Sequence, residues 1–202
     1  MKPSKTALFN SAKNWDVKAL TALVASAPDL IDAADPRGRK ALHIACSVKP
    51  GTPGTQEPNG IRTVSALLRL ADLHDYVPLE EGRFKATPVW YAVAHDDNLP
   101  LVKMLLKRGA RADNCLYAAV WNDNAGVLRE ILKTKPPIND VQEGEPVIIS
   151  AIRWRKLKTL DVLLDAGADV SLRDAKGHDA MFHARRRKLP SRVLARLQAR
   201  PA

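Results

Sequence analysis

The sequence predicts an all-α protein in which about six helix pairs stack into a solenoid, and three observations support this. One phrase occurs twice, at residues 86–113 and 144–170: Pro-Val, a helix rich in small residues, a polar break, and an apolar helix that ends in Gly-Ala. The apolar pair of the second helix lies 13 residues after Ala92, Ala118 and Ser150 alike. Turn sequences separate the phrases. Because a single helix pair cannot cover its own apolar face, such units are stable only when they stack.

The first two predicted units cover residues 5–34 and 35–80. The first is expected, by its position, to cap the N-terminal end of the stack. The second opens with "DPRG", in which Asp, Pro and Gly occupy the positions that a type I turn favours. Its first helix carries the small Ala45, but 22 residues rather than 13 separate Ala45 from Leu67. The Pro/Gly-rich insertion at residues 50–60 accounts for this irregular second unit and is expected to be a loop.

The third unit, residues 81–112, carries local signals for both of its helices. Thr87 is suited to cap the first helix, and Pro88 to the first helical position, where its missing N–H is not needed. Gly109 is placed to end the second helix in the left-handed conformation. The segment before Thr87 is longer than the regular pattern, which predicts an extended turn finger, the loop that joins one helix pair to the next.

The last three units are expected at residues 113–140, 141–173 and 174–200. The fourth is irregular because "DNCLYAAV" follows the third unit so closely that its turn finger is truncated. The fifth repeats the Leu pair and ends its second helix at Gly167, again a left-handed position. The sixth opens with "DAKG", which repeats the Asp and Gly of the earlier turn, and it is expected to cap the C-terminal end.

The chain resembles ankyrin-repeat proteins, and the resemblance covers nearly its whole length. It rests on turn, cap, small residue, Leu pair and Gly-Ala recurring together in "DPRGRKALHIAC" (35–46), "TPVWYAVA" (87–94) with "LVKMLLKRGARAD" (101–113), "EPVIISAI" (145–152) with "LDVLLDAGADVSLRD" (160–174), and "DAKGHDAMFHA" (174–184). The spacing of 34 residues from Glu145 to Asp179 is close to the family's period of about 33. The resemblance implies one ankyrin-repeat domain over residues 1–202, in which His43 binds its own turn by hydrogen bonding.

Composition and charge limit the class of protein and the class of partner. Hydrophobic residues make up 46% and charged residues 27%, as in ordinary soluble proteins. No apolar run approaches the ~20 residues of a membrane helix, and the N-terminal segment lacks the apolar core of a signal peptide. We therefore expect a cytoplasmic protein without membrane insertion, and a monomer. The net charge is +10, and residues 174–202 carry eight Lys/Arg against two Asp/Glu, which favours an acidic partner.

The sequence contains no signal for catalysis, a cofactor or a metal ion. It has no Gly-rich phosphate loop, no G-x-S-x-G elbow and no H-E-x-x-H motif. Cys46 and Cys115 are too few for a four-ligand zinc site and are expected to pack in the core. His178 and His183 are five residues apart, whereas two ligands on one helix face need a spacing of three or four. We therefore expect no enzymatic activity, no cofactor and no metal site.

A partner-binding surface is implied by the resemblance, since the ends of the first helices and the finger tips line the concave face of ankyrin-like arrays. The matching candidates in this chain are Trp15, Arg37, Arg39, Val48, Arg83, Phe84, His95, Trp121, Arg153, Arg186 and Arg187. Exposed tryptophans and arginines are typical of interaction hot spots. The alternatives are a partly buried packing role for each tryptophan and a plain solvated helix surface for the last three arginines.

These features favour a non-catalytic protein-interaction module whose partner is another protein with an acidic surface. The alternative is a nucleic-acid-binding basic repeat protein, which the net charge and the Arg-rich C-terminal end favour. Within the binding class, a scaffold, a toxin-neutralising partner and a bacterial host-directed effector are all compatible. The effector alternative, which includes export to a host cell, rests on the C-terminal "ARRRKLPSRVLARLQARPA". This segment is equally explained as a capping helix pair with Val193, Leu194 and Leu197 packed inward.

Overall fold

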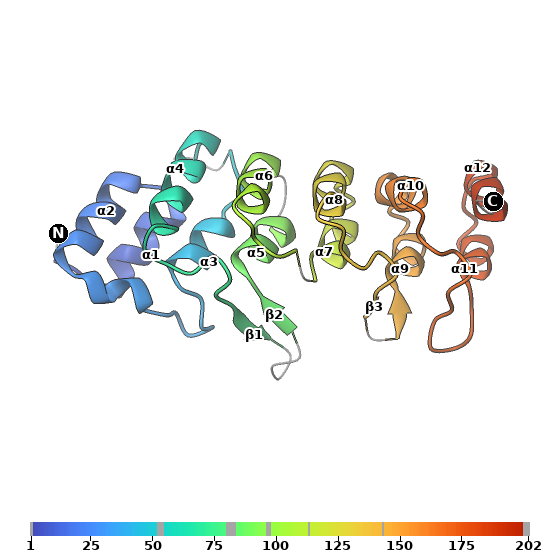
Figure 1. Cartoon of the computed structure of the whole chain (residues 1–202), viewed down its shortest axis with the longest axis horizontal. Coiled ribbons are helices and arrows are strands. Elements are labelled where there is room, and N and C mark those ends of the chain that lie inside the picture. The colour runs from blue at the N-terminus through green and yellow to red at the C-terminus, as the bar shows by residue number, and fades with distance from the viewer. Residues whose placement is uncertain are drawn as a thin grey trace. The chain divides into compact units, whose positions relative to one another are not determined.

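The computed structural model of the chain describes residues 2–51, 55–79, 84–95, 98–112, 114–142 and 144–199, except for the side chains of Glu57 and Leu79. The chain forms two compact units: unit 1 is residues 1–114 and unit 2 is residues 115–202. Within its described residues each unit contains three helix pairs, and the predicted stacking of helix pairs is confirmed in both units (Figure 1). None of the described helices is both long enough and apolar enough to cross a membrane.

The elements of unit 1 are, in chain order, α1 (Lys5–Lys13), α2 (Val17–Ser26), a 3₁₀ helix η1 (Pro28–Asp32), α3 (Ala41–Cys46), α4 (Glu57–Leu67), β1 (Val77–Leu79), β2 (Phe84–Ala86), α5 (Pro88–Ala94) and α6 (Leu99–Lys107). The first helices of the three pairs, α1, α3 and α5, pack in one row. The second helices, α2, α4 and α6, pack in another row against them. Unit 1 is therefore a two-layered stack of helices.

Local sequence explains where the helices of unit 1 begin and end. The side-chain oxygen atoms of Ser4, Asp16, Thr87 and Asn98 each accept the backbone N–H three residues further on, at 2.9–3.4 Å. The predicted cap at Thr87 is thus confirmed. Gly109 has a φ of 92°, so the predicted left-handed end after α6 is confirmed as well.

The Pro/Gly-rich insertion differs from the prediction of a loop, because its last four residues belong to a helix. α4 begins at Glu57, and Pro58 lies in its first turn, where proline is tolerated. Gly60 serves close packing: a Cβ atom at this position would lie 2.8 Å from the indole ring of Trp15. Residues 52–54 of the insertion lie outside the described residues.

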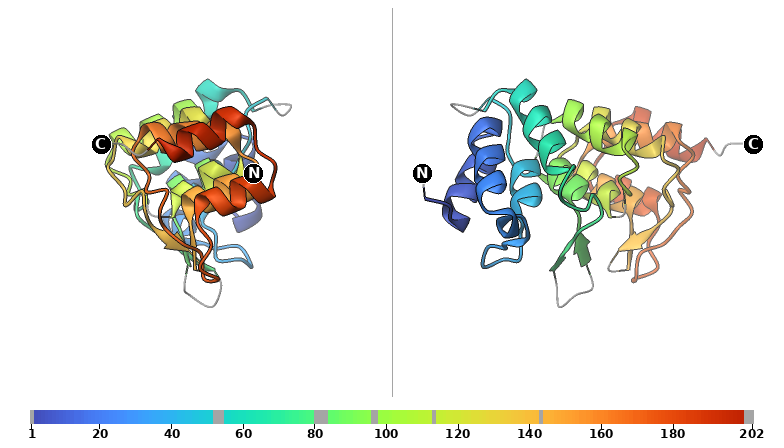
Figure 2. Two further views of the ribbon diagram at one scale, coloured as in Figure 1. Left: turned by 90° about the vertical axis from the view of Figure 1, so that its right-hand side faces the viewer. Right: turned by 60° about the vertical axis from the view of Figure 1, so that its left-hand side comes forward.

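The extra length before Thr87 forms an antiparallel hairpin of β1 and β2, in which Val77 pairs with Ala86. Both of these side chains are buried. The hairpin extends away from the two helix rows of unit 1 (Figure 2, right). The strands are not foreseen from the sequence, because three residues per strand are too few to show an alternation of apolar and polar side chains.

His43 connects the start of α3 to the segment before β1. Its Nδ1 accepts the backbone N–H of Lys40 at 3.3 Å, and its Nε2 lies 3.2 Å from the carbonyl oxygen of Asp75. Because Nδ1 accepts, Nε2 carries the hydrogen and donates to Asp75. The side chain is buried, and this burial lowers the pKa of His43. The structural role that the resemblance implies for His43 is therefore present.

We expect unit 1 to lose stability when the pH falls below about 6.5, the ordinary histidine pKa. The pKa of His43 is lowered in the fold, so below that pH the unfolded chain takes up a proton more readily than the folded chain. The contribution of neutral His43 to stability is complete above the pKa of His43 in the unfolded chain. It is lost as the pH falls through the lower pKa of His43 in the folded chain. Urea unfolding of the wild type and of His43→Gln at a series of pH values measures this. The variant should show a shallower pH dependence, and equal slopes would contradict the prediction.

The elements of unit 2 are, in chain order, α7 (Cys115–Trp121), α8 (Ala125–Leu132), β3 (Val141–Gln142), β4 (Glu145–Pro146), α9 (Val147–Arg153), α10 (Leu157–Asp165), α11 (Ala180–Arg186) and α12 (Ser191–Gln198). α9 packs between α7 and α11, and α10 packs against α8 and α9. The β3–β4 hairpin and the loop that precedes α11 extend to the same side of unit 2 (Figures 1 and 2). These are the turn fingers of this unit.

The turns of unit 2 follow the sequence signals closely. Gly167 has a φ of 80°, and the N–H of Gly177 donates to the carbonyl oxygen of Asp174 at 2.9 Å, so both predicted turns are confirmed. Seven residues, 108–114, separate α6 from α7, whereas fourteen, 166–179, separate α10 from α11. The short connection agrees with a truncated finger before α7. Buried thiols at Cys46 and Cys115 confirm the expected packing of both cysteines in the cores.

Candidate partner-binding site

Two of the predicted contact residues in unit 1 are buried, which for Trp15 agrees with the packing role that the sequence leaves open as the alternative. Trp15 is 2% exposed, and its indole Nε1–H donates to the carbonyl oxygen of Ala45 at 2.8 Å. Phe84 is 8% exposed and packs edge-to-face against Trp90, with the ring centroids 5.1 Å apart. The Trp15 ring thus joins the first helix pair to the second, and the Phe84 ring packs on the helix that follows its strand. Neither ring is therefore part of an exposed surface.

The other candidates of unit 1 that the structure describes lie at or near the surface. Arg37 and His95 are exposed, and Val48 is half-buried. Arg39 is half-buried and forms an ion pair with Asp35, with Nη2 and Oδ2 2.8 Å apart, so its side chain stabilises the turn that it belongs to. Arg83 lies outside the described residues.

Among the candidates in unit 2, Trp121 carries an exposed aromatic ring. It lies at the C-terminal end of α7, is 60% exposed, and meets Trp154 edge-to-face at a centroid distance of 5.1 Å. The ammonium group of Lys156 lies 5.8 Å from the centroid of the Trp121 ring. The two indoles and the cation form an exposed aromatic patch at the turns that follow α7 and α9.

The arginine candidates of unit 2 meet at a cavity of about 460 Å³, which lies between the turn fingers and the helices α9 and α11. Its lining is polar and mostly charged, and consists of Gly144, Glu145, Arg153, Asp174, Ala175, Lys176, His178, His183, Arg186 and Arg187. Arg153 and Arg187 follow Ser150 and Ala184 by three residues each, so they occupy the same position in successive helix pairs. The structure thus brings together three residues that the repeat pattern selects.

The lining has an excess of positive charge. It contains four cationic side chains, Arg153, Lys176, Arg186 and Arg187, and two carboxylates, Glu145 and Asp174, so the formal balance is +2 when the histidines are neutral. Arg153 is partly neutralised, because it forms an ion pair with Glu145. The charge excess therefore falls mainly on Lys176, Arg186 and Arg187.

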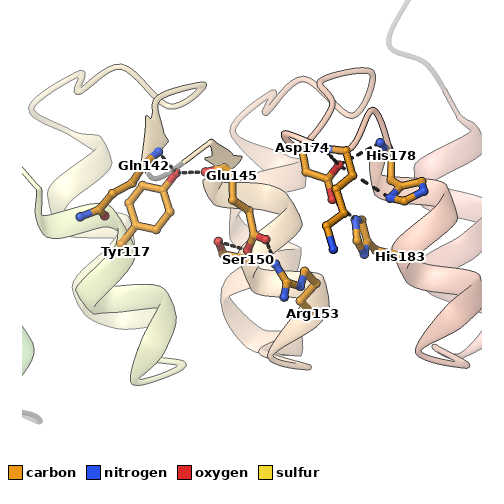
Figure 3. A network of polar contacts seen from close by, with 9 residues as sticks. Tyr117, Gln142, Glu145, Ser150, Arg153, Asp174, His178 and His183 are labelled. Atoms are coloured by element: carbon orange, nitrogen blue, oxygen red, sulfur yellow. Dashed lines mark hydrogen bonds and ion pairs between the residues drawn. The ribbon is translucent and has the colours of Figure 1, made fainter.

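Glu145 is held by several bonds that also fix the wall of the cavity (Figure 3). Its carboxylate accepts the hydroxyl of Ser150 at 2.6 Å in addition to the guanidinium of Arg153. Its backbone carbonyl oxygen accepts the phenol of Tyr117, whose oxygen in turn accepts the N–H of Gln142 at 2.9 Å. Burial raises the pKa of Tyr117 to about 12, so the phenol remains a donor at neutral pH.

At the other wall, Asp174 contacts two histidines (Figure 3). Its Oδ2 lies 2.9 Å from Nε2 of His183, and its Oδ1 lies 3.8 Å from Nδ1 of His178. The backbone N–H groups of His178 and Lys176 also donate to Oδ1, both at 2.9 Å. The hydrogen bond from the backbone of His178 is the main reason why the pKa of Asp174 falls to about 2, so the carboxylate is anionic at neutral pH.

This three-residue cluster is missed by helix-spacing reasoning, which treats His178 and His183 as members of one helix. His178 lies before α11, at the end of the turn that Asp174 begins, so the helical spacing rule does not apply to it. The sequence contains one signal for the contact of Asp174 with His178: Asp35 and Arg39 have the same four-residue spacing in the earlier turn, and they form an ion pair. Asp179 caps α11 by accepting the backbone N–H of Phe182, whereas His183 contacts Asp174.

The chain is similar to one family model and to several solved structures. The model described as ankyrin repeats (3 copies) matches residues 59–174, slightly more than half of the chain. The ankyrin repeat protein EF0377 is 20% identical with a TM-score of 0.75, covering 98% of this chain and 99% of its own. An ankyrin repeat domain from Acinetobacter baumannii is 23% identical with a TM-score of 0.74, covering 96% and 97%.

A third similar chain belongs to the complex of the predatory endopeptidase Bd0816 from Bdellovibrio bacteriovorus with the immunity protein Bd3460. It is 24% identical with a TM-score of 0.73, and the match covers 99% of this chain and 100% of that one. At these identities the likeness concerns the fold. No curated protein matches the chain.

Proposed function

Because the chain belongs to the ankyrin-repeat family, whose repeats are generally protein-interaction modules, we propose that it binds an acidic segment of another protein in the cavity of unit 2. The observation that carries this proposal is the meeting of Lys176, Arg186 and Arg187 at one cavity. Lys176 lies in the turn finger before α11, and the two arginines lie at the C-terminal end of α11. No catalytic step is part of the proposal.

The charge of the cavity supports an anionic ligand group. Arg186 and Arg187 are exposed, and within the described part of the chain their side chains form no ion pair, so they are available to a partner. A guanidinium group offers paired N–H donors that match a carboxylate, and such charge-assisted hydrogen bonds are stronger than neutral ones. The positive field also accelerates the approach of an acidic partner. A segment that places Asp or Glu side chains in the cavity therefore fits best.

The aromatic patch supplies a second contact of a different kind. Trp121 occupies the same repeat position as Arg153 and Arg187, three residues after Ala118. Its exposed ring, stacked edge-to-face on Trp154, offers an apolar contact without a large loss of side-chain entropy. In the proposal, acidic side chains of the partner bind the cavity and an apolar side chain packs on Trp121. Arg37, Arg39, Val48, Arg83 and His95 in unit 1 remain predicted contacts.

Neutralisation of a toxin is the more specific candidate within this class. Its support is the structural likeness to one chain from a complex of an endopeptidase with an immunity protein. The likeness covers 99% of the present chain and 100% of that chain. An interaction surface formed by a cavity and an exposed aromatic ring is suitable for covering a folded partner. Inhibition of a hydrolase that co-purifies with this chain would support the candidate, and binding without inhibition would count against it.

The proposal is tested by selecting peptides from a random library with the wild-type chain as bait. We expect Asp and Glu to be enriched among the selected peptides. In the variant Arg186→Glu/Arg187→Glu, the affinity for such a peptide should fall at least about ten-fold, because charge-assisted hydrogen bonds are lost and like charges are introduced. Arg153 is left unchanged, because a glutamate there would repel Glu145 and disturb the fold.

The matched control is Lys158→Glu/Arg192→Glu, which changes the net charge equally at exposed residues that do not line the cavity. It should bind like the wild type. Equal losses in both variants would show a non-specific charge effect, and selected peptides without acidic residues would overturn the proposal. The nucleic-acid alternative predicts retention of DNA or RNA on filters with a steep salt dependence, close to one unit of log–log slope per neutralised phosphate.

A further inference from the structure

The cluster of Asp174, His178 and His183 brings three metal-ligating side chains to one wall of the cavity in unit 2 (Figure 3). One donor atom from each residue lies within 4.8 Å of the other two. Oδ2 of Asp174 lies 2.9 Å from Nε2 of His183, and Oδ1 of the same carboxylate lies 3.8 Å from Nδ1 of His178. Around a tetrahedral zinc ion, with bonds of 2.0–2.1 Å, neighbouring ligand atoms are about 3.3 Å apart. The separation of Oδ2 of Asp174 and Nε2 of His183 is shorter than that value, and the limit of 4.8 Å for all three donor atoms is longer.

We propose that Asp174, His178 and His183 form a binding site for a divalent transition metal ion of the Zn²⁺ class. The ligands are Oδ2 of Asp174, Nδ1 of His178 and Nε2 of His183. The metal takes the place of the hydrogen that Nε2 of His183 shares with Asp174, so the neutral imidazole of His183 carries its hydrogen on Nδ1 in the metal-bound form. The site does not depend on the proposed partner, and it goes beyond binding of an acidic segment.

The three side chains are already oriented by bonds that the metal does not replace. Oδ1 of Asp174 is held by two backbone N–H groups, which leaves Oδ2 directed at His183. The backbone N–H of Asp174 also donates to the carbonyl oxygen of His178 at 2.9 Å and closes the turn. His183 is buried on α11, and the ring of His178 stacks on Phe182 with the centroids 3.8 Å apart. Such preorganisation lowers the entropic cost of binding a metal.

The donor set selects the class of ion. Two imidazole nitrogens and one carboxylate oxygen suit Zn²⁺ and its neighbours in the transition series, whereas Mg²⁺ and Ca²⁺ prefer oxygen ligands. Three protein ligands leave the fourth position open towards the cavity, as in sites where a metal binds an external ligand. Lys176, Arg186 and Arg187 line the same cavity, so their charge favours an anionic ligand at that position. A carboxylate is such a ligand.

The test is a Zn²⁺ titration of the untagged, chelator-treated full chain by isothermal calorimetry, together with Co²⁺ absorption. We expect one saturable Zn²⁺ site per chain, a visible Co²⁺ absorption band, and no comparable heat with Mg²⁺. His178→Ala should lower the Zn²⁺ affinity at least about ten-fold, because replacing even a hydrogen-bond partner of a metal ligand typically costs that much affinity. The control His74→Ala, at an exposed histidine of unit 1, should leave the affinity unchanged.

Absence of saturable Zn²⁺ binding by the wild type would overturn the proposal, and so would equal affinity of the wild type and His178→Ala. Equal competition by Mg²⁺ would exclude a nitrogen-based site. If His178→Ala does not fold, the wild type still decides. Imidazole ¹⁵N signals should shift on Zn²⁺ addition at Nδ1 of His178 and Nε2 of His183, and unshifted signals at these two atoms would overturn the proposal.

Discussion

Replacement of Trp15 by alanine is expected to lower the free energy of unfolding of unit 1 by about 3–5 kcal/mol, the usual cost of truncating a large buried aromatic side chain. The ring is 2% exposed and its Nε1–H donates to the carbonyl oxygen of Ala45, so the variant leaves both a cavity and an unpaired buried acceptor. Gly60 is positioned against the same ring and cannot move in to fill the space without shifting α4. The measurement is urea unfolding, with hydrogen exchange of the unit 1 amides to assign the effect to that unit.

Trp121→Ala is the matched control, because Trp15 and Trp121 both lie three residues after the small residue of their first helix, Ala12 and Ala118. Trp121 is 60% exposed and its main ring contact is with Trp154, so its removal should cost at most about 1 kcal/mol. Equal destabilisation by the two substitutions would contradict the different roles that we assign to the two rings.

These two tryptophans show what the repeat pattern can and cannot predict. Position in the repeat places Trp121 at the end of α7 and Trp15 two residues after the end of α1, because each follows the small residue of its first helix by three. It does not predict burial, which depends on the neighbouring pair. Trp15 is covered because the insertion in the second pair places Gly60 beneath its ring. From its neighbours in the sequence alone, Gly60 indicates a loop. Its close contact with the Trp15 ring explains why a glycine occupies this position of a helix.

The candidate site divides in a similar way. The meeting of Arg153 and Arg187 at one cavity follows from equal repeat positions, since stacking translates a position from one pair to the next. The cluster around Asp174 does not follow from helical spacing. It depends on a turn that folds back so that His178 reaches the carboxylate of Asp174 from outside α11, while His183 reaches it from within the helix. Rules for residues on one helix face do not describe that geometry.

The second large effect is expected for Leu105→Ala, which should destabilise unit 1 by about 2–5 kcal/mol. Leu105 is fully buried on α6, and α6 packs on both α5 and α4. Since each helix pair of a repeat stack is stabilised mainly by its neighbours, the loss should also increase hydrogen exchange in α4 and α5. The control is Leu106→Ala, the next residue on the same helix, which is half-buried and should cost clearly less. A protection loss confined to α6, or equal costs at the two leucines, would show that the stack in unit 1 is not held together by this shared apolar face.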